Sequence, residues 1–391
     1  MTQPFQDRLS HVIVFAPYIE QDGKLVSPHY EMPEYRAEIG GWMDALGLSW
    51  NWQPVTARQL PQILATARDM ALTRGALVFN LCDGSDSDGY PGLEVVEGLE
   101  NLGIPFTGSD PEFYRLTTSK SQSKRALIAA GVQTAPFVMI GDVESDLPRA
   151  VTEIGFPLFI KPDVSAGSYG IQIDSVCYDI EAARHKVVQL QQGLHGQHFE
   201  KDGIMAERFI EGREFTVLVV EDSAEPMGLW VLPPGERVFD KRVPARERFL
   251  AYERYWGLPE ASRPIPADEP YYWYAMAPAE LQPELANLAR RAMRAVGGCG
   301  YGRVDIRLDE RSGLIHVLEV NAQCGLSSDD SSTVGSMLRL SGVSVVDLIA
   351  RVLRHGMNRP RAPGPANRPQ TEIPAVRGTQ HHGPRNQNGT S

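Results

Sequence analysis

The first third of the chain alternates short apolar runs with segments of helical periodicity. Residues 11–17 (HVIVFAP) and 76–81 (ALVFNL) are apolar, β-branched runs typical of buried parallel strands. Residues 34–47 and 93–102 carry apolar side chains at helical spacing, and Gly103 ends the second segment. The segment IPFTGSDPEFY (residues 104–114) should be a strand that enters a turn. This pattern predicts an α/β domain over residues 1–118.

Two further blocks, residues 119–205 and 206–355, follow with their own strands and helices. The first should hold helices 119–131 and 180–190 and strands 157–162 and 170–176 around a glycine-rich turn. The second should begin with strand 204–207, hold a hairpin within residues 302–330 and end with helix 345–354. Residues 222–280 have weak periodicity and predict a lid-like loop or small subdomain. Residues 356–391 have almost no large apolar side chains and predict a disordered tail.

Composition narrows the class of protein. A net charge of −11 over 391 residues offers no basic face for nucleic acid. The four cysteines have no CxxC pair and no histidine at metal-ligand spacing, which argues against a disulfide framework and a zinc site. The N-terminus lacks the apolar core of a signal peptide, and no stretch reaches the ~18 apolar residues of a membrane span. We therefore expect a cytoplasmic protein with no membrane partner.

The hairpin predicted within residues 302–330 carries the clearest chemistry. Asp305 lies on its first strand, and Glu319 and Asn321 lie two apart on its second, so the last two share a face. Carboxylate and amide oxygens suit Mg²⁺. A solvated face is the alternative for any one of these residues, but the set together predicts a metal site.

The sequences around these residues, GRVDIRLD and LEVNAQCG, resemble the metal-binding end of the D-alanine–D-alanine ligases of the ATP-grasp superfamily. Three other segments resemble that family in the same order along the chain: residues 83–120, PLFIKPDVSAGSYGI (157–171) and IMAERFIEGREFTV (204–217). The resemblance implies an α/β fold with an N-terminal Rossmann-like parallel-sheet domain and two α+β ATP-grasp subdomains that clamp ATP. It also implies a ligase that joins a small-molecule carboxylate to an amine through an acyl-phosphate, and a homodimer.

The resemblance also implies a role for individual residues around ATP. Lys120 and Lys161 match the lysines that touch the phosphates, and Ser168 lies in the phosphate loop SAGSYG (165–170). The hinge should pair with adenine, Glu214 should bind the ribose and Leu318 should lie beside the nucleotide; the hinge residues are Glu207, Arg208, Phe209 and Ile210. A lysine that reaches solvent, a plain turn and an edge strand are the alternatives.

The catalytic end follows from the same resemblance. Asp305, Glu319 and Asn321 would hold two Mg²⁺ ions, with Mn²⁺ as an alternative ion. Arg303 and the backbone N–H of Gly325 match the groups that hold the oxyanion. Arg303 as a structural ion-pair partner is an equal alternative. Lys241 is the candidate for the lysine of the family's lid.

The substrate half departs from the family pattern. The family's glycine-rich turn for the first amino acid is replaced by residues 16–35, where Glu20 is the candidate substitute. Asp83 stands where a histidine is usual, and Gly167 stands where a serine is usual. Asp329 and Asp330 occupy the position that grips the second carboxylate, where they would repel an anion unless Ser328, Ser331 or Ser332 compensates.

These departures favour an amide ligase for an amino acid or related acid other than D-alanine. A D-alanine–D-alanine ligase of cell-wall synthesis is the nearest alternative. A kinase of the same fold would instead transfer the γ-phosphate to a stable acceptor. An ATP-binding regulator without activity is least favoured, because it would not need three metal ligands together with Arg303.

Overall fold

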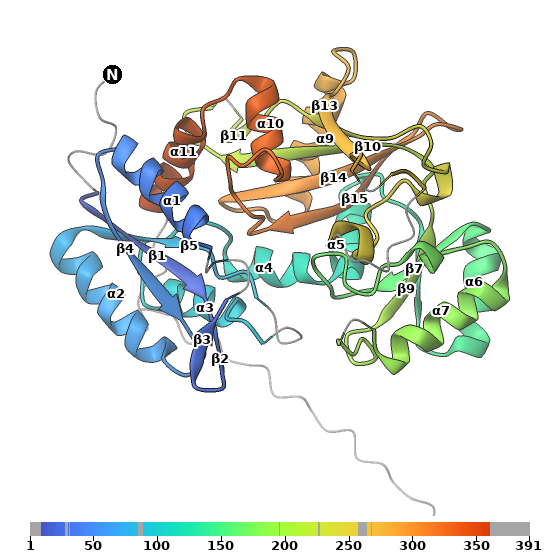
Figure 1. Cartoon of the computed structure of the whole chain (residues 1–391), viewed down its shortest axis with the longest axis horizontal. Coiled ribbons are helices and arrows are strands. Elements are labelled where there is room, and N and C mark those ends of the chain that lie inside the picture. The colour runs from blue at the N-terminus through green and yellow to red at the C-terminus, as the bar shows by residue number, and fades with distance from the viewer. Residues whose placement is uncertain are drawn as a thin grey trace, which may run out of the picture.

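The computed structural model describes residues 9–27, 30, 32–84, 89–194, 196–225, 227–256, 264–266 and 268–359. Three sheets organise this part of the chain, and Figure 1 shows them side by side, with the N-terminal elements in blue, the central sheet in green and the large sheet mostly in orange. A short hairpin, β2 (Ile19–Gln21) and β3 (Lys24–Val26), follows the first strand.

The N-terminal sheet is parallel, with strand order β4 (Ser49–Val55), β1 (His11–Pro17) and β5 (Ala76–Asn80). Alternate residues of β1 enter two different cores, as the two faces of a strand require. Val12 and Val14 pack with α1 (Pro33–Ala45) and with the C-terminal helix α11 (Val345–Asn358). Ile13 and Phe15 pack with α2 (Leu60–Arg74) and α3 (Leu93–Asn101). Helix α11 therefore covers one face of the N-terminal sheet, so the last described residues lie close to the first ones.

The central sheet has strand order β6 (Phe137–Ile140), β9 (Ile204–Arg208), β7 (Leu158–Pro162) and β8 (Val176–Cys177). Its apolar face is covered by α6 (Val143–Ile154) and α7 (Ile180–Gln192). Two helices, α4 (Pro111–Thr118) and α5 (Lys120–Ala129), lead into it from the N-terminal unit and lie below the large sheet in Figure 1. The open face of the central sheet therefore turns toward the large sheet.

The large sheet is antiparallel, and β10 and β14 lie at its centre. Its strands are, in order, β13 (Tyr272–Met276), β12 (Gly235–Phe239), β10 (Gly212–Glu221), β14 (Tyr301–Asp309) and β15 (Ile315–Ala322), and β11 (Leu229–Val231) pairs with β10. Helix α9 (Gln282–Ala295) buries Leu285, Ala289 and Met293 against one face. Helix α10 (Thr333–Ser341) precedes α11 and packs near β13.

Most predicted elements are confirmed to within a few residues, and the misses have local causes. The pattern gave no sign of β4, α2, β6 or α6. The strand predicted from residue 104 is wrong, because only Phe106 forms an isolated bridge, to Val78, and residues 111–118 are helical. The strand predicted over residues 170–176 is also wrong, because this segment forms a 3₁₀ turn, Ile173–Ser175, and only Val176 and Cys177 pair with β7.

The segment 222–280 differs from the predicted loop or subdomain, because β12 and β13 within it extend the large sheet. Among the described residues between these two strands, the turns Ala245–Glu247 and Tyr252–Tyr255 (α8) lie outside the sheet. The predicted tail begins too early, since α11 continues to Asn358; the rest of that prediction, from residue 360, lies outside the described residues. The domain boundaries stay a proposal, and we place the second one after Arg208 so that β9 remains whole.

Substitution Phe15→Ala should destabilise the N-terminal unit strongly. The Phe15 side chain, on β1, is fully buried against α2 and α3. Removal of a buried phenylalanine side chain costs ~3–5 kcal/mol. Leu72→Ala is the matched control, because Leu72 lies on α2 with 72% of its surface exposed and should cost less than ~0.5 kcal/mol. Urea unfolding followed by circular dichroism measures both. Equal midpoints for the two variants would contradict this packing.

Candidate active site

One cavity of about 410 Å³ lies between the central and large sheets. Its lining includes the predicted residues Lys120, Lys161, Ser168, Glu207, Arg208, Phe209, Ile210, Glu214, Arg303, Asp305, Leu318, Glu319, Asn321 and Gly325. Lys241 is not among the lining residues. It is exposed just beyond β12, and its carbonyl oxygen accepts a hydrogen bond from Arg248. The structure thus brings together every residue predicted to contact ATP, the metal or the oxyanion, but not the lysine assigned to the lid.

An aromatic pocket forms one end of the cavity, at the end of β9. The ring of Phe209 stacks with that of Phe159 at 5.9 Å between centroids, and Phe249 contacts both rings edge-on. Ile171 and Leu318 add aliphatic lining. A flat apolar slot of this kind suits a purine base. Next to it, the carbonyl oxygen of Ile210 accepts a hydrogen bond from Nη1 of Arg307 at 2.8 Å.

Three buried lysines and one glutamate lie behind this pocket. Nζ of Lys161 lies 2.5 Å from Oε1 of Glu207, and Nζ of Lys124 lies 2.9 Å from Oε2. Burial raises the pKa of Glu207, but the two ammonium groups outweigh burial and hold that pKa at about 2. Lys120 donates to the carbonyl oxygen of Ser165 at 2.7 Å, and burial lowers its pKa. Even with Asp163 counted beside Glu207, three ammonium groups face two carboxylates, which leaves a positive excess suited to a polyphosphate.

Asp163 holds Lys120 in place. Its carboxylate accepts hydrogen bonds from the backbone N–H of Ser121 at 2.6 Å and from the hydroxyls of Ser119 and Ser121 at 2.7 and 2.9 Å. Its carbonyl oxygen accepts from the N–H of Lys120. The first turn of α5 is therefore fixed to the end of β7, which carries Lys161. Sequence reasoning missed Asp163, and it also missed Lys124, although Lys124 is one helical turn after Lys120.

The phosphate loop is held from outside by the segment around α8. Gly167 and Ser168 both adopt left-handed conformations, with φ of 54° and 62°. The indole N–H of Trp256 donates to the carbonyl oxygen of Gly167 at 3.0 Å, and the N–H of Tyr252 donates to Ile171 at 2.8 Å. The indole thus lies where the family's serine was expected.

The predicted metal ligands converge where strands β14 and β15 of the large sheet line the cavity. Strand pairing places Asp305 opposite Glu319 and Arg303 opposite Asn321. The amide Nδ2 of Asn321 donates to Asp305 at 3.0 Å and to Glu319 at 3.4 Å, and the hydroxyl of Thr216 donates to Asp305 at 2.9 Å. Two carboxylates and an amide thus meet in one place and fit a divalent ion with a preference for oxygen.

Arg303 pairs with Asp305, at 2.8 Å between Nη2 and Oδ2 and 3.0 Å between Nε and Oδ1. Burial alone would raise the pKa of Asp305, but the Arg303 guanidinium outweighs burial and lowers it. The carboxylate is therefore ionised and ready to receive a cation.

A β-bulge explains how the adjacent residues Leu318 and Glu319 can both face the cavity. The register shifts between Asp305 and Ile306, so that Asp305 pairs with Glu319 while Ile306 pairs with Val317. Leu318 is the extra residue. Strict alternation would place Leu318 and Glu319 on opposite faces, and the bulge removes this restriction.

Glu214, predicted to bind ribose, is flanked by two arginines that sequence reasoning missed. Arg237 is its neighbour on β12 and Arg307 its neighbour on β14, and both form ion pairs with its carboxylate. Arg237 also lines the cavity and donates to the hydroxyl of Tyr274 at 2.7 Å. Arg237 could not be assigned from sequence because β12 itself was not predicted.

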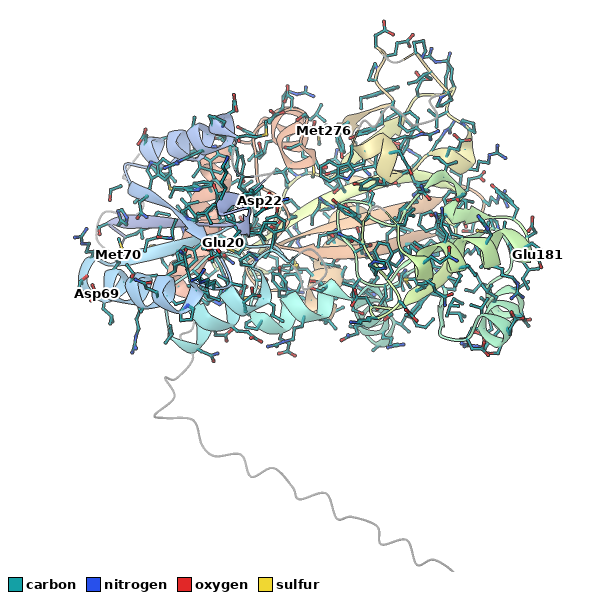
Figure 2. All side chains as sticks on the ribbon, turned by 60° about the horizontal axis from the view of Figure 1, so that its bottom comes forward. Glu20, Asp22, Asp69, Met70, Glu181 and Met276 are labelled. Atoms are coloured by element: carbon teal, nitrogen blue, oxygen red, sulfur yellow. The ribbon has the colours of Figure 1, made fainter. Side chains whose placement is uncertain are left out.

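Some of the residues expected to bind the substrates line the cavity, and others do not. Glu20, labelled in Figure 2, lies on the β2–β3 hairpin and is 43% exposed. It pairs with Arg58 at 3.6 Å and does not line the cavity. Glu38 on α1 instead accepts hydrogen bonds from Ser327 and from the N–H and hydroxyl of Ser328. Asp83 and Thr333 line the cavity. Asp330 does not line it and pairs with Arg339 at 2.9 Å.

No helix in the described ranges is both long enough and apolar enough to cross a membrane.

Comparisons with known proteins agree with this geometry. The D-alanine–D-alanine ligase of Xanthomonas axonopodis pv. citri is 29% identical over 302 residues, which are 76% of this chain and 84% of that protein. The fold is shared with the ligase of Bacillus anthracis solved with ATP (TM-score 0.58, 18% identity, 90% of this chain and 97% of that chain). It is also shared with the biotin carboxylase domain of Hydrogenobacter thermophilus 2-oxoglutarate carboxylase solved with MgADP (TM-score 0.59, 17% identity, 88% and 69%).

The family described as "D-ala D-ala ligase C-terminus" matches residues 127–354, more than half of the chain. The chain belongs to this family and is an ATP-dependent carboxylate–amine ligase of the ATP-grasp fold.

Proposed function

We propose that the protein forms an amide from an amino acid or related acid and an amine, with ATP as the energy source and the cavity between the two sheets as the active site. The observation that carries this proposal is the separation of charge within one cavity. Buried ammonium groups lie on the side of the central sheet, and two carboxylates with an amide lie on strands β14 and β15 of the large sheet. A nucleotide with its base against Phe209 would direct its phosphates from the first set toward the second.

Transfer of the γ-phosphate needs positioned charge more than covalent chemistry from the protein. Lys120 and Lys161 would neutralise phosphate oxygens. The substrate carboxylate oxygen attacks the γ-phosphorus, the bond to ADP breaks, and an acyl-phosphate forms. The amine then attacks the acyl carbon, inorganic phosphate leaves, and the amine gives up a proton to complete the amide.

Asp305, Glu319 and the side-chain oxygen of Asn321 would hold the metal, which we propose to be two Mg²⁺ ions, with Mn²⁺ as a substitute. When bound, the metal would supply charge neutralisation at the phosphates. Arg303, which pairs with Asp305 in the structure, would hold the oxyanion together with the N–H of Gly325.

We propose a substrate other than D-alanine. The cavity wall contains Asp83. The glutamate that contacts the Ser327–Ser328 turn is Glu38 of α1, and not Glu20 of the loop after the first strand. Arg237 adds a cation of its own to the wall. The alternative, D-alanine–D-alanine ligation, is favoured by the names of the relatives. We also propose that the enzyme acts in the cytoplasm as a homodimer.

The decisive experiment is phosphate release from Mg·ATP against a panel of L- and D-amino acids and small acids, singly and in pairs, with mass spectrometry of the products. We expect release that depends on a pair and yields an amide mass, with D-alanine alone a poor substrate. Full activity with D-alanine alone would establish the alternative. A phosphorylated product without an amide would contradict the ligase mechanism.

Glu319→Gln should lower turnover at least ~100-fold, because it replaces a charged metal ligand with a neutral side chain of the same shape. Thermal melting should stay close to that of the wild type. Glu310→Gln is the matched control, because Glu310 lies exposed in the turn of the same hairpin and should keep wild-type turnover. Turnover by Glu319→Gln near the wild-type level would contradict the proposed metal ligands.

Arg237→Gln and Lys241→Ala together test which cation of the 222–280 segment acts in catalysis. Arg237 faces the cavity and Lys241 is exposed, so we expect at least a ~10-fold loss of kcat/KM for the first and less than ~3-fold for the second. Steady-state kinetics with ATP as the varied substrate measures both. The reverse order would restore Lys241 to the role predicted from sequence.

A further inference from the structure

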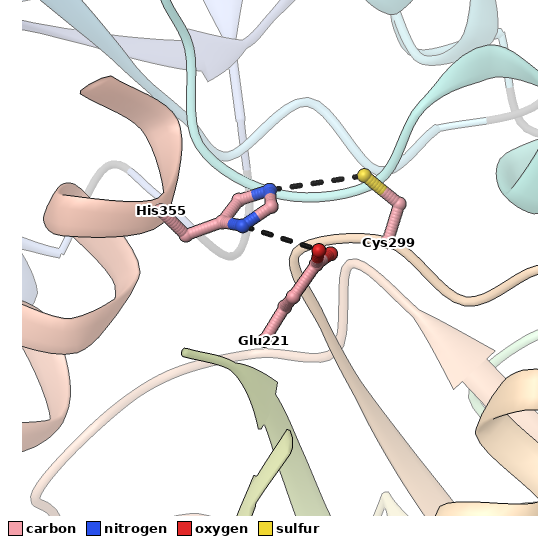
Figure 3. Close-up of side chains that lie close together, drawn as sticks. All are labelled: Glu221, Cys299 and His355. Atoms are coloured by element: carbon pink, nitrogen blue, oxygen red, sulfur yellow. Dashed lines mark hydrogen bonds and ion pairs between the residues drawn. The ribbon is translucent and has the colours of Figure 1, made fainter. Parts of the chain in front are cut away.

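Three metal-binding side chains converge outside the cavity. Glu221 ends β10, Cys299 lies in the turn between α9 and β14, and His355 lies in the last turns of α11 (Figure 3). Sγ of Cys299 lies 3.7 Å from Nε2 of His355, and Oε2 of Glu221 lies 3.6 Å from Nδ1. One donor atom from each residue lies within 4.8 Å of the other two. The catalytic mechanism uses none of them.

The separation of 3.7 Å between Sγ and Nε2 is close to that between two ligand atoms of a tetrahedral zinc ion. Zinc binds sulfur at ~2.3 Å and nitrogen or oxygen at ~2.0–2.2 Å, so its ligand atoms lie ~3.3–3.6 Å apart. The imidazole presents one nitrogen to each neighbour, and an ion would use only one of them. Nε2 faces the sulfur and would be the nitrogen that binds the ion. The carboxylate of Glu221 would then have to move from Nδ1 toward the sulfur, and its side chain is 40% exposed. His355 and Cys299 need little movement.

The thiol is held rigidly in this place. Gly300 follows Cys299 with φ of 75°, and a Cβ on Gly300 would lie 2.1 Å from the carbonyl oxygen of Gly108. The turn is therefore pressed against residue 108. Cys82, Cys177 and Cys324 are buried, whereas Cys299 keeps partial exposure among the described cysteines. A cysteine that only filled space would need neither this exposure nor an imidazole beside its sulfur.

The surrounding charges leave the site anionic once the thiol is ionised. Asp110 and Asp222 act electrostatically on His355, and Arg359 acts on both His355 and Cys299. The guanidinium of Arg359 lies over the ring of Phe106, with Nη1 3.4 Å from the carbonyl oxygen of Gly108. Asp222 is itself paired with Arg351 at 2.5 Å and with Arg354 at 3.3 Å. Arg359 therefore opposes Glu221, Asp110 and the thiolate.

We propose that Glu221, Cys299 and His355 form a second metal site, for a borderline or soft divalent ion such as Zn²⁺, with water in the fourth position. The donor set of sulfur, nitrogen and oxygen separates this site from the all-oxygen magnesium site. The ion would connect α11 and β10 to the start of β14, the strand that carries Arg303 and Asp305. Sequence spacing argued against zinc because Cys299 and His355 are 56 residues apart and meet only in the fold.

Metal-free full-length protein should bind one Zn²⁺ per chain at this site, measured by competition with a chromophoric chelator. Cys299→Ser should weaken that binding by more than the ~10–100-fold typical of an outer-shell change. Co²⁺ should give a near-ultraviolet thiolate charge-transfer band in the wild type and none in Cys299→Ser. Cys324→Ser and Glu319→Gln are controls for an ion in the cavity, and both should keep the zinc and the band.

Circular dichroism of each metal-free variant shows whether it is folded, and Glu221→Gln supplies a second variant because its side chain is half-exposed. Loss of zinc by folded Cys299→Ser or Glu221→Gln, with retention by both controls, is the expected result. Equal zinc affinity in the wild type, Cys299→Ser and Glu221→Gln would overturn the proposal. So would a cobalt band that disappears in Cys324→Ser and persists in Cys299→Ser.

Discussion

The register between β14 and its two neighbours is the constraint on which the site depends. Pairing with β10 places Thr216 beside Asp305, and pairing with β15 places Glu319 on its other side. A slip of one residue would turn these side chains to the opposite face, against α9. The apolar residues of the same strands prevent this, because Val304, Ile306, Val317 and Val320 are buried in the α9 core. The packing that folds the large sheet is thus what assembles the metal ligands.

The phosphate end depends on the same sheet through a chain of hydrogen bonds. Lys124 pairs with Glu207 of the central sheet and donates to the hydroxyl of Thr134 at 2.8 Å. Thr134 in turn donates to the carbonyl oxygen of Val317 at 2.7 Å. Val317 is two residues before Glu319. The cluster that holds Lys161 is therefore hydrogen-bonded to the strand that carries the proposed metal ligands. The lysines and these ligands keep a fixed spacing although they lie on different sheets.

The parts of the site that sequence could predict are those whose chemistry is local. Asp305, Glu319 and Asn321 were recognisable because one hairpin brings them together, and the hinge after β9 because it is one continuous segment. Arg237, Arg307 and Asp163 were not, because each acts through a partner distant in sequence. The bulge at Leu318 has no signature in an apolar run. Likewise the sequences of β4 (SWNWQPV) and β12 (GERVF) show no clear alternation of apolar and polar residues. The N-terminal sheet was therefore predicted without β4, and the large sheet without β12.

The departures from the family concentrate at the substrate end for a physical reason. Phosphoryl transfer needs charges of fixed sign at fixed places, and in the proposed site they come from the residues that match the family pattern. Substrate recognition needs only complementarity to one pair of small molecules, so different elements can provide it. Here α1 supplies Glu38 to the Ser327–Ser328 turn, and Trp256 takes a place beside Gly167. Because a carboxylate such as Asp83 disfavours an anionic neighbour and favours an ammonium group, we expect the cavity wall to influence the charge of the group that it receives.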